Sequence, residues 1–326
     1  MRQIRYGKMA IWTNFVAKTT FIILNITTMK KIFRILGLAL LSIFLIVAIA
    51  ATYFTYRFNS QAKVRVDLTP ANVEIPVDSI SVERGRVLSV GCRSCHGNNL
   101  EGKYFFDDPT IGKLASSNLT RAKGSPTEHY TDVDWVRAIR HGLGKDGRML
   151  FVMPSESMCH LSDKDLGCLI AFIKTLPPIE NHFDEPTLTA FSKILAGAGQ
   201  FGELYPYKII DHEKAQNIPH PAEVNSLEHG YYMVQSHGCV SCHKPDFGGG
   251  KSPDPVSPPA ANISSSGNPG KWTKGQFIET LRNGKTPEGK VLDPQFMPFD
   301  GIAVFSDEEI GSIYDYIMSL PPAEKK

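Results

Sequence analysis

The sequence predicts an all-α protein in which one N-terminal transmembrane helix is followed by two similar helical domains in tandem. Three observations support this prediction. A long uncharged stretch lies near the N-terminus, a Cys-x-x-Cys-His motif occurs once in each half, and a series of landmarks downstream of each motif repeats in the same order. A chain of 326 residues is long enough for two domains of ordinary size besides a membrane segment.

The N-terminal region has the features of a membrane anchor. Residues 35–56 form a stretch of 22 uncharged, mostly apolar residues, close to the ~20 that span a bilayer as a helix. Seven basic residues and no acidic residue precede it: Arg2, Arg5, Lys8, Lys18, Lys30, Lys31 and Arg34. This asymmetry predicts a single pass through the inner membrane, with the N-terminus in the cytoplasm and the rest on the periplasmic side. A cleaved signal peptide ending at Ala48-Ile49-Ala50 is the alternative, although the apolar stretch continues beyond it.

The chain is predicted to consist of six consecutive segments. Met29-Lys30-Lys31 has the look of an ordinary protein start. Residues 1–28 are therefore either a cytoplasmic N-terminal segment or sequence that is not translated. The remaining segments are a transmembrane anchor at 29–56, a polar linker at 57–77, a first domain at 78–178, a connector at 179–224 and a second domain at 225–326.

The two Cys-x-x-Cys-His motifs carry the chemistry. The motifs comprise Cys92, Cys95 and His96 in the first half and Cys239, Cys242 and His243 in the second. This spacing is typical of covalent c-type haem attachment, in which both thiols form thioethers and the histidine becomes the proximal iron ligand. A thioredoxin-type dithiol would give the trailing histidine no role, and a zinc site would require two converging ligand pairs. We therefore expect two covalently attached haem c groups.

Five landmarks recur after the motifs, which indicates a duplicated domain. They are Asn118-Leu119-Thr120 and Asn262-Ile263-Ser264, Arg140-His141-Gly142 and Arg282-Asn283-Gly284, Met153-Pro154 and Met297-Pro298, Ser162-Asp163 and Ser306-Asp307, and Leu176-Pro177-Pro178 and Leu320-Pro321-Pro322. Ser-Asp is typical of a helix N-cap and a double proline of a helix end. Further helices are predicted to begin near residues 78–81, to lead from Ser226 into the second motif, and to cover about residues 188–198.

The repeat also selects the second iron ligand. In the first half, five downstream side chains are candidates: Met149, Met153, Met158, His141 and His160. Projected onto the second half, they become Asp293, Met297, Ile302, Asn283 and Val304. Only Met153 has a ligating counterpart, so His96 with Met153 and His243 with Met297 are the predicted axial pairs. An iron with both axial positions filled passes an electron but binds no substrate.

Each half resembles a class I cytochrome c domain, with an N-terminal helix, the haem motif, a Met-Pro loop and a C-terminal helix. Over about residues 78–325 the chain is similar to the membrane-bound cytochrome c subunits of bacterial quinoprotein and flavoprotein dehydrogenases, of the alcohol and gluconate type. The resemblance implies two tandem class I cytochrome c domains that carry electrons in a respiratory chain. Several members of that family have three haem motifs, whereas this chain has two and an N-terminal anchor.

The predicted function is electron transfer outside the cytoplasmic membrane, between a dehydrogenase or quinol-oxidising complex and a terminal acceptor. The protein is expected to be a carrier with redox protein partners and no small-molecule substrate. Without the seven N-terminal basic residues, 28 Lys and Arg stand against 33 Asp and Glu, which argues against nucleic-acid binding. The alternatives are a dihaem cytochrome c peroxidase-type enzyme and a structural subunit that ties a respiratory complex to the membrane.

Some other residues have two competing interpretations. Arg140 and Arg282 either pair with haem propionates or face solvent at a helix end. Asn118 and Asn262 fit a loop hydrogen-bonding role better than glycosylation. Cys159 and Cys168 are expected to be two buried thiols, in preference to a disulfide.

Overall fold

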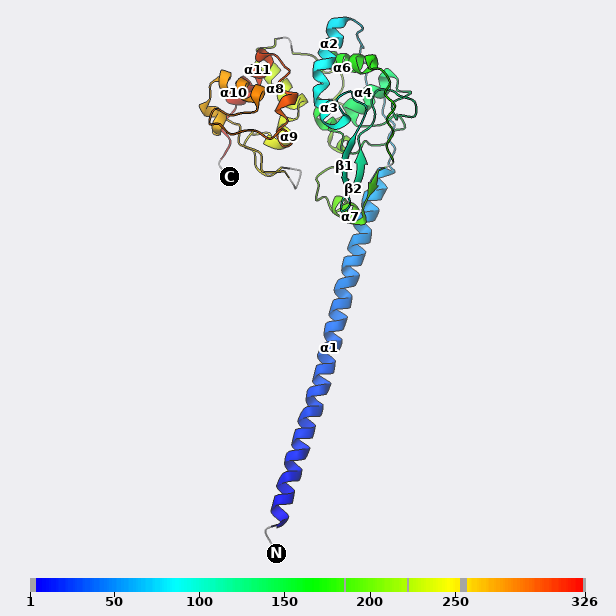
Figure 1. Cartoon of the computed structure of the whole chain (residues 1–326), viewed down its shortest axis with the longest axis vertical. Helices are drawn as coiled ribbons and strands as arrows, with labels where there is room; N and C mark the ends of the chain where they lie inside the picture. Colours follow the sequence, from blue (N-terminus) through cyan, green and yellow to red (C-terminus); the bar gives the residue numbers. More distant parts are fainter. Residues whose placement is uncertain (1–3, 185, 222, 253–256, 325–326) are drawn as a thin grey trace. The chain divides into compact units, whose positions relative to one another are not determined.

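The computed structural model describes residues 4–184, 186–221, 223–252 and 257–324. The chain forms two compact units, Met1–Tyr56 and Arg57–Lys326. Figure 1 shows mostly helices, with a few short strands in the second unit. The predicted all-α class is therefore confirmed.

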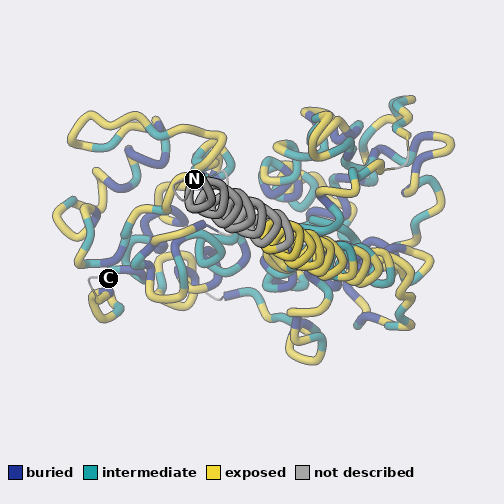
Figure 2. The backbone as a smooth tube through the Cα atoms, turned by 90° about the horizontal axis from the view of Figure 1, so that it is seen from below, coloured by how far each residue is buried: buried dark blue, intermediate teal, exposed yellow. Residues whose placement is uncertain are grey.

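The first unit consists of most of the long helix α1 (Ile4–Ala62). Its segment Thr28–Ala62 is long and apolar enough to cross a membrane. The side chains of residues 28–47 are all exposed, as the yellow part of this helix in Figure 2 shows. Lys30, Lys31 and Arg34 are the charged residues of this stretch, and residues 35–47 are uncharged on every side of the helix. The helix runs six residues beyond the predicted end of the anchor, into the second unit.

The first haem-motif domain is built from five helices: α2 (Ser79–Leu88), α3 (Val90–His96), α4 (Asp132–His141), α5 (Ser155–Met158) and α6 (Asp163–Thr175). The predicted caps are confirmed, because Asp78 accepts a hydrogen bond from Ser81 N and Ser162 accepts one from Asp165 N. Helix α2 packs across α6 where Gly85 leaves room: a Cβ at this position would lie 1.9 Å from the carbonyl oxygen of Cys168.

The second domain repeats this arrangement with α8 (Leu227–Ser236), α9 (Cys239–His243), the 3-10 helix η2 (Asn268–Lys271), α10 (Lys274–Asn283), the 3-10 helix η3 (Phe299–Gly301) and α11 (Asp307–Ser319). Helix α8 packs on α11, and Gly230 occupies the place of Gly85, with its position for a Cβ 2.1 Å from Ser312 O. Ser306 and Glu309 form a capping box at the start of α11. The N-cap predicted from Ser-Asp is thus confirmed in this half as well.

The remaining elements are a small sheet and the helices of the connector. Strands β1 (Tyr104–Asp108), β2 (Gly112–Ala115) and β3 (Thr187–Leu188) pair antiparallel in that order, with Phe106 opposite Leu114 and Lys113 opposite Thr187. The sheet was not predicted. Helix α7 (Ala190–Gly197) confirms the predicted connector helix, and the 3-10 helix η1 (Pro206–Ile209) follows it.

The structure corrects one alignment between the halves. Helices α4 and α10 both end at a left-handed glycine, Gly142 and Gly284, each with φ 64°. A short hairpin follows in each domain, closed by the bridge Leu143–Met149 in the first and Lys285–Val291 in the second. The counterpart of Met149 is therefore Val291, not Asp293. The error arose because four residues separate Leu292 from Met297, whereas two separate Leu150 from Met153.

Candidate haem-binding sites

Each motif histidine is oriented by a main-chain carbonyl. His96 Nδ1 lies 2.7 Å from Ser117 O, and His243 Nδ1 lies 2.8 Å from Ala261 O. Because a carbonyl only accepts hydrogen bonds, Nδ1 carries the proton and Nε2 keeps its lone pair, which is the form that binds iron. Burial lowers the pKa of both imidazoles and so favours this neutral form.

The repeated asparagine holds the loop that supplies this carbonyl. Asn118 Oδ1 accepts hydrogen bonds from Thr120 N at 2.9 Å and Thr120 Oγ1 at 2.7 Å. Asn262 Oδ1 accepts the same two bonds, at the same distances, from Ser264. In each domain the residue just before the asparagine carries the oxygen that contacts the histidine. The predicted loop role of the two asparagines is confirmed, and it bears directly on the site.

The motif cysteines fit haem attachment. All four are free thiols, and burial raises the pKa of Cys92 to about 11 and that of Cys239 to about 12. Reactive dithiols and zinc sites need thiolates, which a raised pKa disfavours. Among the described residues, no three His, Cys, Asp or Glu side chains are grouped to hold a metal ion. The residues present therefore fit thioether formation better than either alternative.

An unsatisfied donor in the first domain also fits a haem. Trp135 is 2% exposed, and its Nε1 has no acceptor among the described residues. A buried N–H without a partner is costly, and a haem propionate is an acceptor that would satisfy it. Phe277 takes the place of Trp135 in the second domain, so this donor belongs to the first domain alone.

The two Met-Pro segments share one backbone hydrogen bond, although an α-helical turn follows the first and a 3-10 turn follows the second. Ser155 N donates to Met153 O at 2.7 Å, and Phe299 N donates to Met297 O at 2.7 Å. Both methionines are half-buried. Two rival candidates have other roles, since Met149 is buried beside Leu143 and Tyr205, and the ring of His141 bonds to that of His212.

The two repeated arginines bond within their own domains, and the solvent-facing role does not fit the buried Arg140. A haem propionate stays a predicted partner, because Arg140 Nε has no acceptor among the described residues. Arg140 is 1% exposed and donates to Asp163 Oδ1 and Leu161 O, both at 2.7 Å. Arg282 donates to Asp307 Oδ1 at 2.7 Å and to Ala303 O. Each arginine thus ties the helix before the Met-Pro loop to the first residue of the domain's last helix. Its effect on the site is to hold both ends of that loop.

The two remaining cysteines are separate buried thiols, as expected. Cys159 lies 7% exposed against Ile210 and Ala215 of the connector, and Cys168 lies 1% exposed within α6. Burial raises the pKa of both. These thiols fill the core and have no evident part in the haem sites.

A buried ion-pair network that the sequence did not reveal joins the two domains. Arg84 of α2 donates to both carboxylate oxygens of Asp165 at 2.9 Å and to Glu309 Oε1 of the second domain at 2.6 Å. Tyr232, also of the second domain, donates to Asp165 Oδ2 at 2.6 Å. No sequence signal marks this pairing, since each partner is charged or polar in the usual way and lies far away in the chain.

The same interface brings each haem motif to the other domain's Met-Pro loop. Helix α3, which carries the first motif, contacts η3, which follows Met297-Pro298. Conversely, a Cβ at Gly238, just before the second motif, would lie 3.0 Å from Ser157 Oγ in α5, which follows Met153-Pro154. The contact is therefore reciprocal.

Both halves match known protein families. Residues 82–177 match the family model described as Cytochrome c, and residues 225–317 match the model described as Cytochrome C oxidase, cbb3-type, subunit III. These two matches cover the two haem-motif domains found in the structure.

Similar proteins include cytochrome subunits of dehydrogenases. The chain is 26% identical over 284 residues to the fructose dehydrogenase cytochrome subunit of Gluconobacter japonicus, covering 78% of this chain and 54% of that protein. It is 25% identical over 276 residues to the alcohol dehydrogenase (quinone) cytochrome c subunit of Gluconacetobacter polyoxogenes, covering 75% and 57%. A diheme cytochrome c-type protein of Cereibacter sphaeroides is 27% identical over 261 residues, covering 72% and 83%. The chain thus spans little more than half the length of the two dehydrogenase subunits.

Proposed function

We propose that this chain, whose two halves are cytochrome c domains, is a membrane-anchored dihaem cytochrome that relays electrons on the periplasmic side of the inner membrane. The coarser part, an electron-transfer cytochrome, follows from the two domain matches and the relatives. The apolar segment Thr28–Ala62 and the basic residues ahead of it support the anchor and its orientation.

Eight side chains would hold two haem c groups. Cys92, Cys95, Cys239 and Cys242 would form the thioethers, while His96 with Met153 and His243 with Met297 would be the axial pairs. Bound haem supplies an iron that exchanges one electron. The carbonyls of Ser117 and Ala261 favour the imidazole tautomer that would bind iron. The Met-Pro turns, which share one backbone hydrogen bond, would supply the two sulfurs.

The reciprocal contact between the two domains is the observation that best supports electron transfer from one haem to the other. A haem attached at α3 would have its thioether edge beside η3, and a haem attached at α9 would have its edge beside α5. Such an arrangement would place the two attachment edges at one interface, so electrons would pass between the domains there without crossing either domain's full width.

The partners are proposed from the chemistry of the relatives. Several are named as subunits of dehydrogenases, of fructose, alcohol or gluconate. A dehydrogenase or quinol-oxidising complex would give electrons to this chain, and a terminal acceptor outside the membrane would take them. In this scheme the chain itself transforms no small molecule.

Spectroscopy of the full chain in detergent tests the proposal. We expect two covalently bound haems, both low-spin when oxidised and insensitive to cyanide at rest. Met153→Ala and Met297→Ala should each convert one haem to the high-spin form, whereas Met149→Leu, in the buried cluster, should convert neither. A resting high-spin haem that binds cyanide and turns over peroxide with a reduced donor would instead identify a peroxidase-type enzyme.

A further inference from the structure

Helix α7 of the connector has a polar side chain inward and its apolar side chains outward. Ser192 is 3% exposed, whereas Phe191 is 55% exposed. Ile194 and Leu195 are only half-buried, and neither of them nor Phe191 belongs to a hydrophobic core formed by the described residues. A helix on a water-facing surface has the opposite arrangement, with its apolar side toward the protein.

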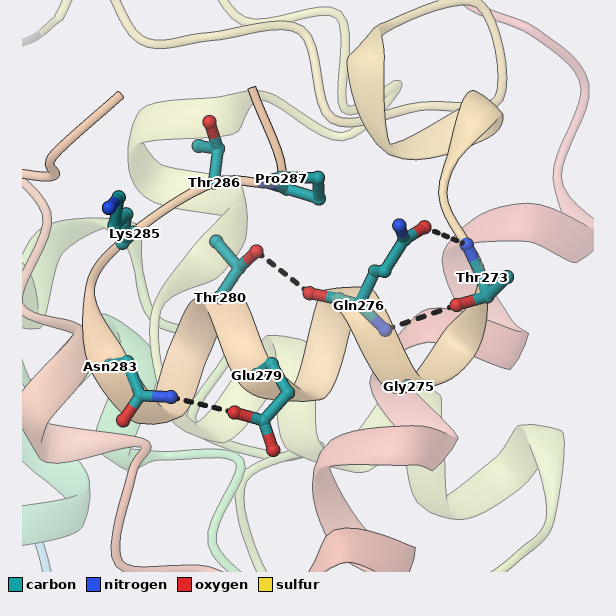
Figure 3. Close-up of a pocket in the computed structure, with 9 residues that line it drawn as sticks. All are labelled: Thr273, Gly275, Gln276, Glu279, Thr280, Asn283, Lys285, Thr286 and Pro287. Carbon is teal, nitrogen blue, oxygen red and sulfur yellow. Dashed lines mark hydrogen bonds between the residues drawn. The ribbon is translucent and has the colours of Figure 1, made fainter. Parts of the chain in front are cut away.

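Helix α10 of the second domain shows the ordinary arrangement. Phe277 and Leu281 of this helix are buried in the core. Its other side lines the pocket drawn in Figure 3 and carries polar side chains there, among them Gln276, Glu279 and Asn283. The reversed pattern of α7 is therefore a property of α7 and not of surface helices throughout this protein. It indicates an apolar environment outside α7.

Hydrogen bonds to the turn between β1 and β2 explain why Ser192 lies inward. Ser192 Oγ donates to Ile111 O at 2.6 Å, and Thr189 Oγ1 donates to Thr110 O at 2.6 Å. Ile111 is itself 39% exposed. The start of α7 and this turn are thus tied together and both carry exposed apolar side chains. We call Ile111, Phe191, Ile194 and Leu195 the α7 patch.

The other end of α7 is bonded to the last turns of α1. Arg57 Nη1 donates to Gly197 O at 3.0 Å, and Figure 1 shows α7 beside the end of α1. The next residue, Phe58, is 8% exposed, and its ring packs edge-on against that of Phe151 with the centroids 6.0 Å apart. These contacts hold this side of the second unit against residues 57–62 of α1.

Arg57 is the first charged residue after the uncharged stretch 35–56, and Tyr53 and Tyr56 precede it. Tyrosine is enriched where a membrane helix enters the headgroup region, so Arg57 lies at the level of the headgroups in the proposed anchor. Because Tyr56 and Arg57 are consecutive, this holds at any angle between the two units. Helix α7 is only roughly 12 Å long, so the whole helix lies close to this level.

We propose that the α7 patch lies on the periplasmic surface of the lipid bilayer and inserts its apolar side chains at the boundary between headgroups and acyl chains. The inference rests on the proposed membrane anchor, because lipid is the apolar environment next to Arg57. The basic side chains of Arg57 and Lys193 suit the phosphates at this level. Helix α7 would then act as an interfacial helix and hold the first haem domain at the membrane surface.

Nitroxide labels on single introduced cysteines test the proposal in the full-length holoprotein, held in nanodiscs of phosphatidylethanolamine and phosphatidylglycerol. Phe191→Cys and Ile111→Cys are labelled separately, and an unchanged haem spectrum shows that each variant folds. Both labels should collide more often with oxygen, which is enriched in lipid, than with a water-soluble nickel complex. Collisions are measured relative to nitrogen, which cancels the relaxation caused by the haem irons.

Two further labels provide the matched controls. Ile43→Cys lies within the anchor and should report lipid, and Val291→Cys, at a 72% exposed position of the second domain, should report water. The proposal is overturned if the labels at positions 191 and 111 are as accessible to the nickel complex as the label at 291. If the label at 43 is accessible as well, the anchor itself is wrong, so failure of this inference is distinguished from failure of the proposed function.

Discussion

At the scale of single residues, matched positions in the two halves show which groups the fold requires. The asparagine turn and the carbonyl that orients the histidine are present twice. His141 is present once, with Asn283 as its counterpart. The His141 ring is fully buried, and its Nδ1 lies 3.0 Å from Nδ1 of His212, whose Nε2 contacts Tyr207 O at 2.9 Å. Because a carbonyl only accepts, the proton of neutral His212 is on Nε2 and its Nδ1 has a lone pair. His141 Nδ1 therefore donates to His212 Nδ1.

This arrangement predicts acid sensitivity of the first domain. Burial, with the neighbouring His212 and the nearby arginines, lowers the pKa of His141 to about 4. Its pKa in the unfolded chain is about 6.5. The neutral ring is favoured by folding, so its contribution is complete above the unfolded pKa and is lost as the pH falls from about 6.5 to 4. His141 alone should therefore lower the free energy of unfolding by ~2–3 kcal/mol between pH 7.5 and 4.5.

Urea unfolding at the two pH values measures this effect. His141→Asn, which installs the residue of the second domain, should remove ~2–3 kcal/mol of the pH dependence. The part due to His237, whose pKa burial also lowers to about 4, should remain. His129→Asn, at an exposed position in the same domain, should keep the full pH dependence. An unchanged pH dependence in His141→Asn would show that another group is responsible.

At the scale of elements, close helix packing depends on one glycine in each domain. Gly85 and Gly230 let α2 and α8 approach the backbone of α6 and α11, where a Cβ would lie about 2 Å from a carbonyl oxygen. The main chain on the far side cannot move aside as a flexible side chain would. The crossing of first and last helices, which frames each haem site, thus rests on these two positions.

Gly85→Ala is therefore expected to destabilise the protein by ~3 kcal/mol, the cost of overpacking a rigid core. Gly275→Ala is the matched control, since the nearest atom to its Cβ would be 3.9 Å away, within helix α10. That change should stabilise by ~0.5–1 kcal/mol, because alanine loses less backbone entropy in a helix. Thermal unfolding of both variants compares them, and equal effects would contradict the packing argument.

Helices were easier to predict than the other elements because their signals are local. Ser162 and Ser306 cap the start of the last helix in each domain, and the double prolines end it. Both signals act within a few residues of the helix end. The strands were missed because β1 and β2 have five and four residues and no clear alternation. The hairpins after α4 and α10 have the same backbone pattern. Their local sequence therefore does not predict that Val66 packs on Gly147 of the first hairpin, whereas no described residue packs on Gly289 of the second.

At the scale of the whole molecule, Arg84 is the residue that couples the domains. Its guanidinium holds a carboxylate of its own domain and one of the other, and lies over the ring of Phe305 at 5.6 Å. Asp165 is 1% exposed, and its charge is stabilised by Arg84 together with the hydroxyl of Tyr232. Burial by itself would raise the pKa of Asp165, but the pairing with Arg84 outweighs it, and the pKa is lowered.

Arg84→Ala should therefore lower the free energy of unfolding by about 3 kcal/mol, because it leaves a buried carboxylate unpaired. It should also slow electron exchange between the two haems, measured by flash photolysis of the half-reduced protein. Arg86→Ala, two residues away on the same helix, removes only an exposed pair with Glu83 and should change neither quantity. Unaltered exchange in Arg84→Ala would mean that the interface does not set the route.

The haem motifs and the duplication could be predicted from the sequence because each is a pattern of residue types at fixed spacing. The domain interface could not be predicted, because Arg84 and Glu309 are 225 positions apart and the residues around each give no indication that the two pair. The predicted counterpart of Met149 was wrong for a related reason. The loop before Met297 is two residues longer than the loop before Met153, so positions counted back from the Met-Pro landmark are shifted by two residues.

The hairpin after α4 contacts both the linker before the first domain and the connector after it, through the bonds Val66 N to Gly147 O and Val152 N to Leu204 O. These contacts have a consequence for how the protein folds during synthesis. Val66 leaves the ribosome before the domain that it contacts, and His212 leaves it after that domain, so the domain stays incomplete until the connector has been synthesised. The hairpin therefore has one covered and one uncovered flank until residues 204–212 have been made, which happens before the second domain is synthesised. A nascent chain stalled before residue 204 would keep an uncovered hairpin edge, and such an edge is prone to pair with other chains.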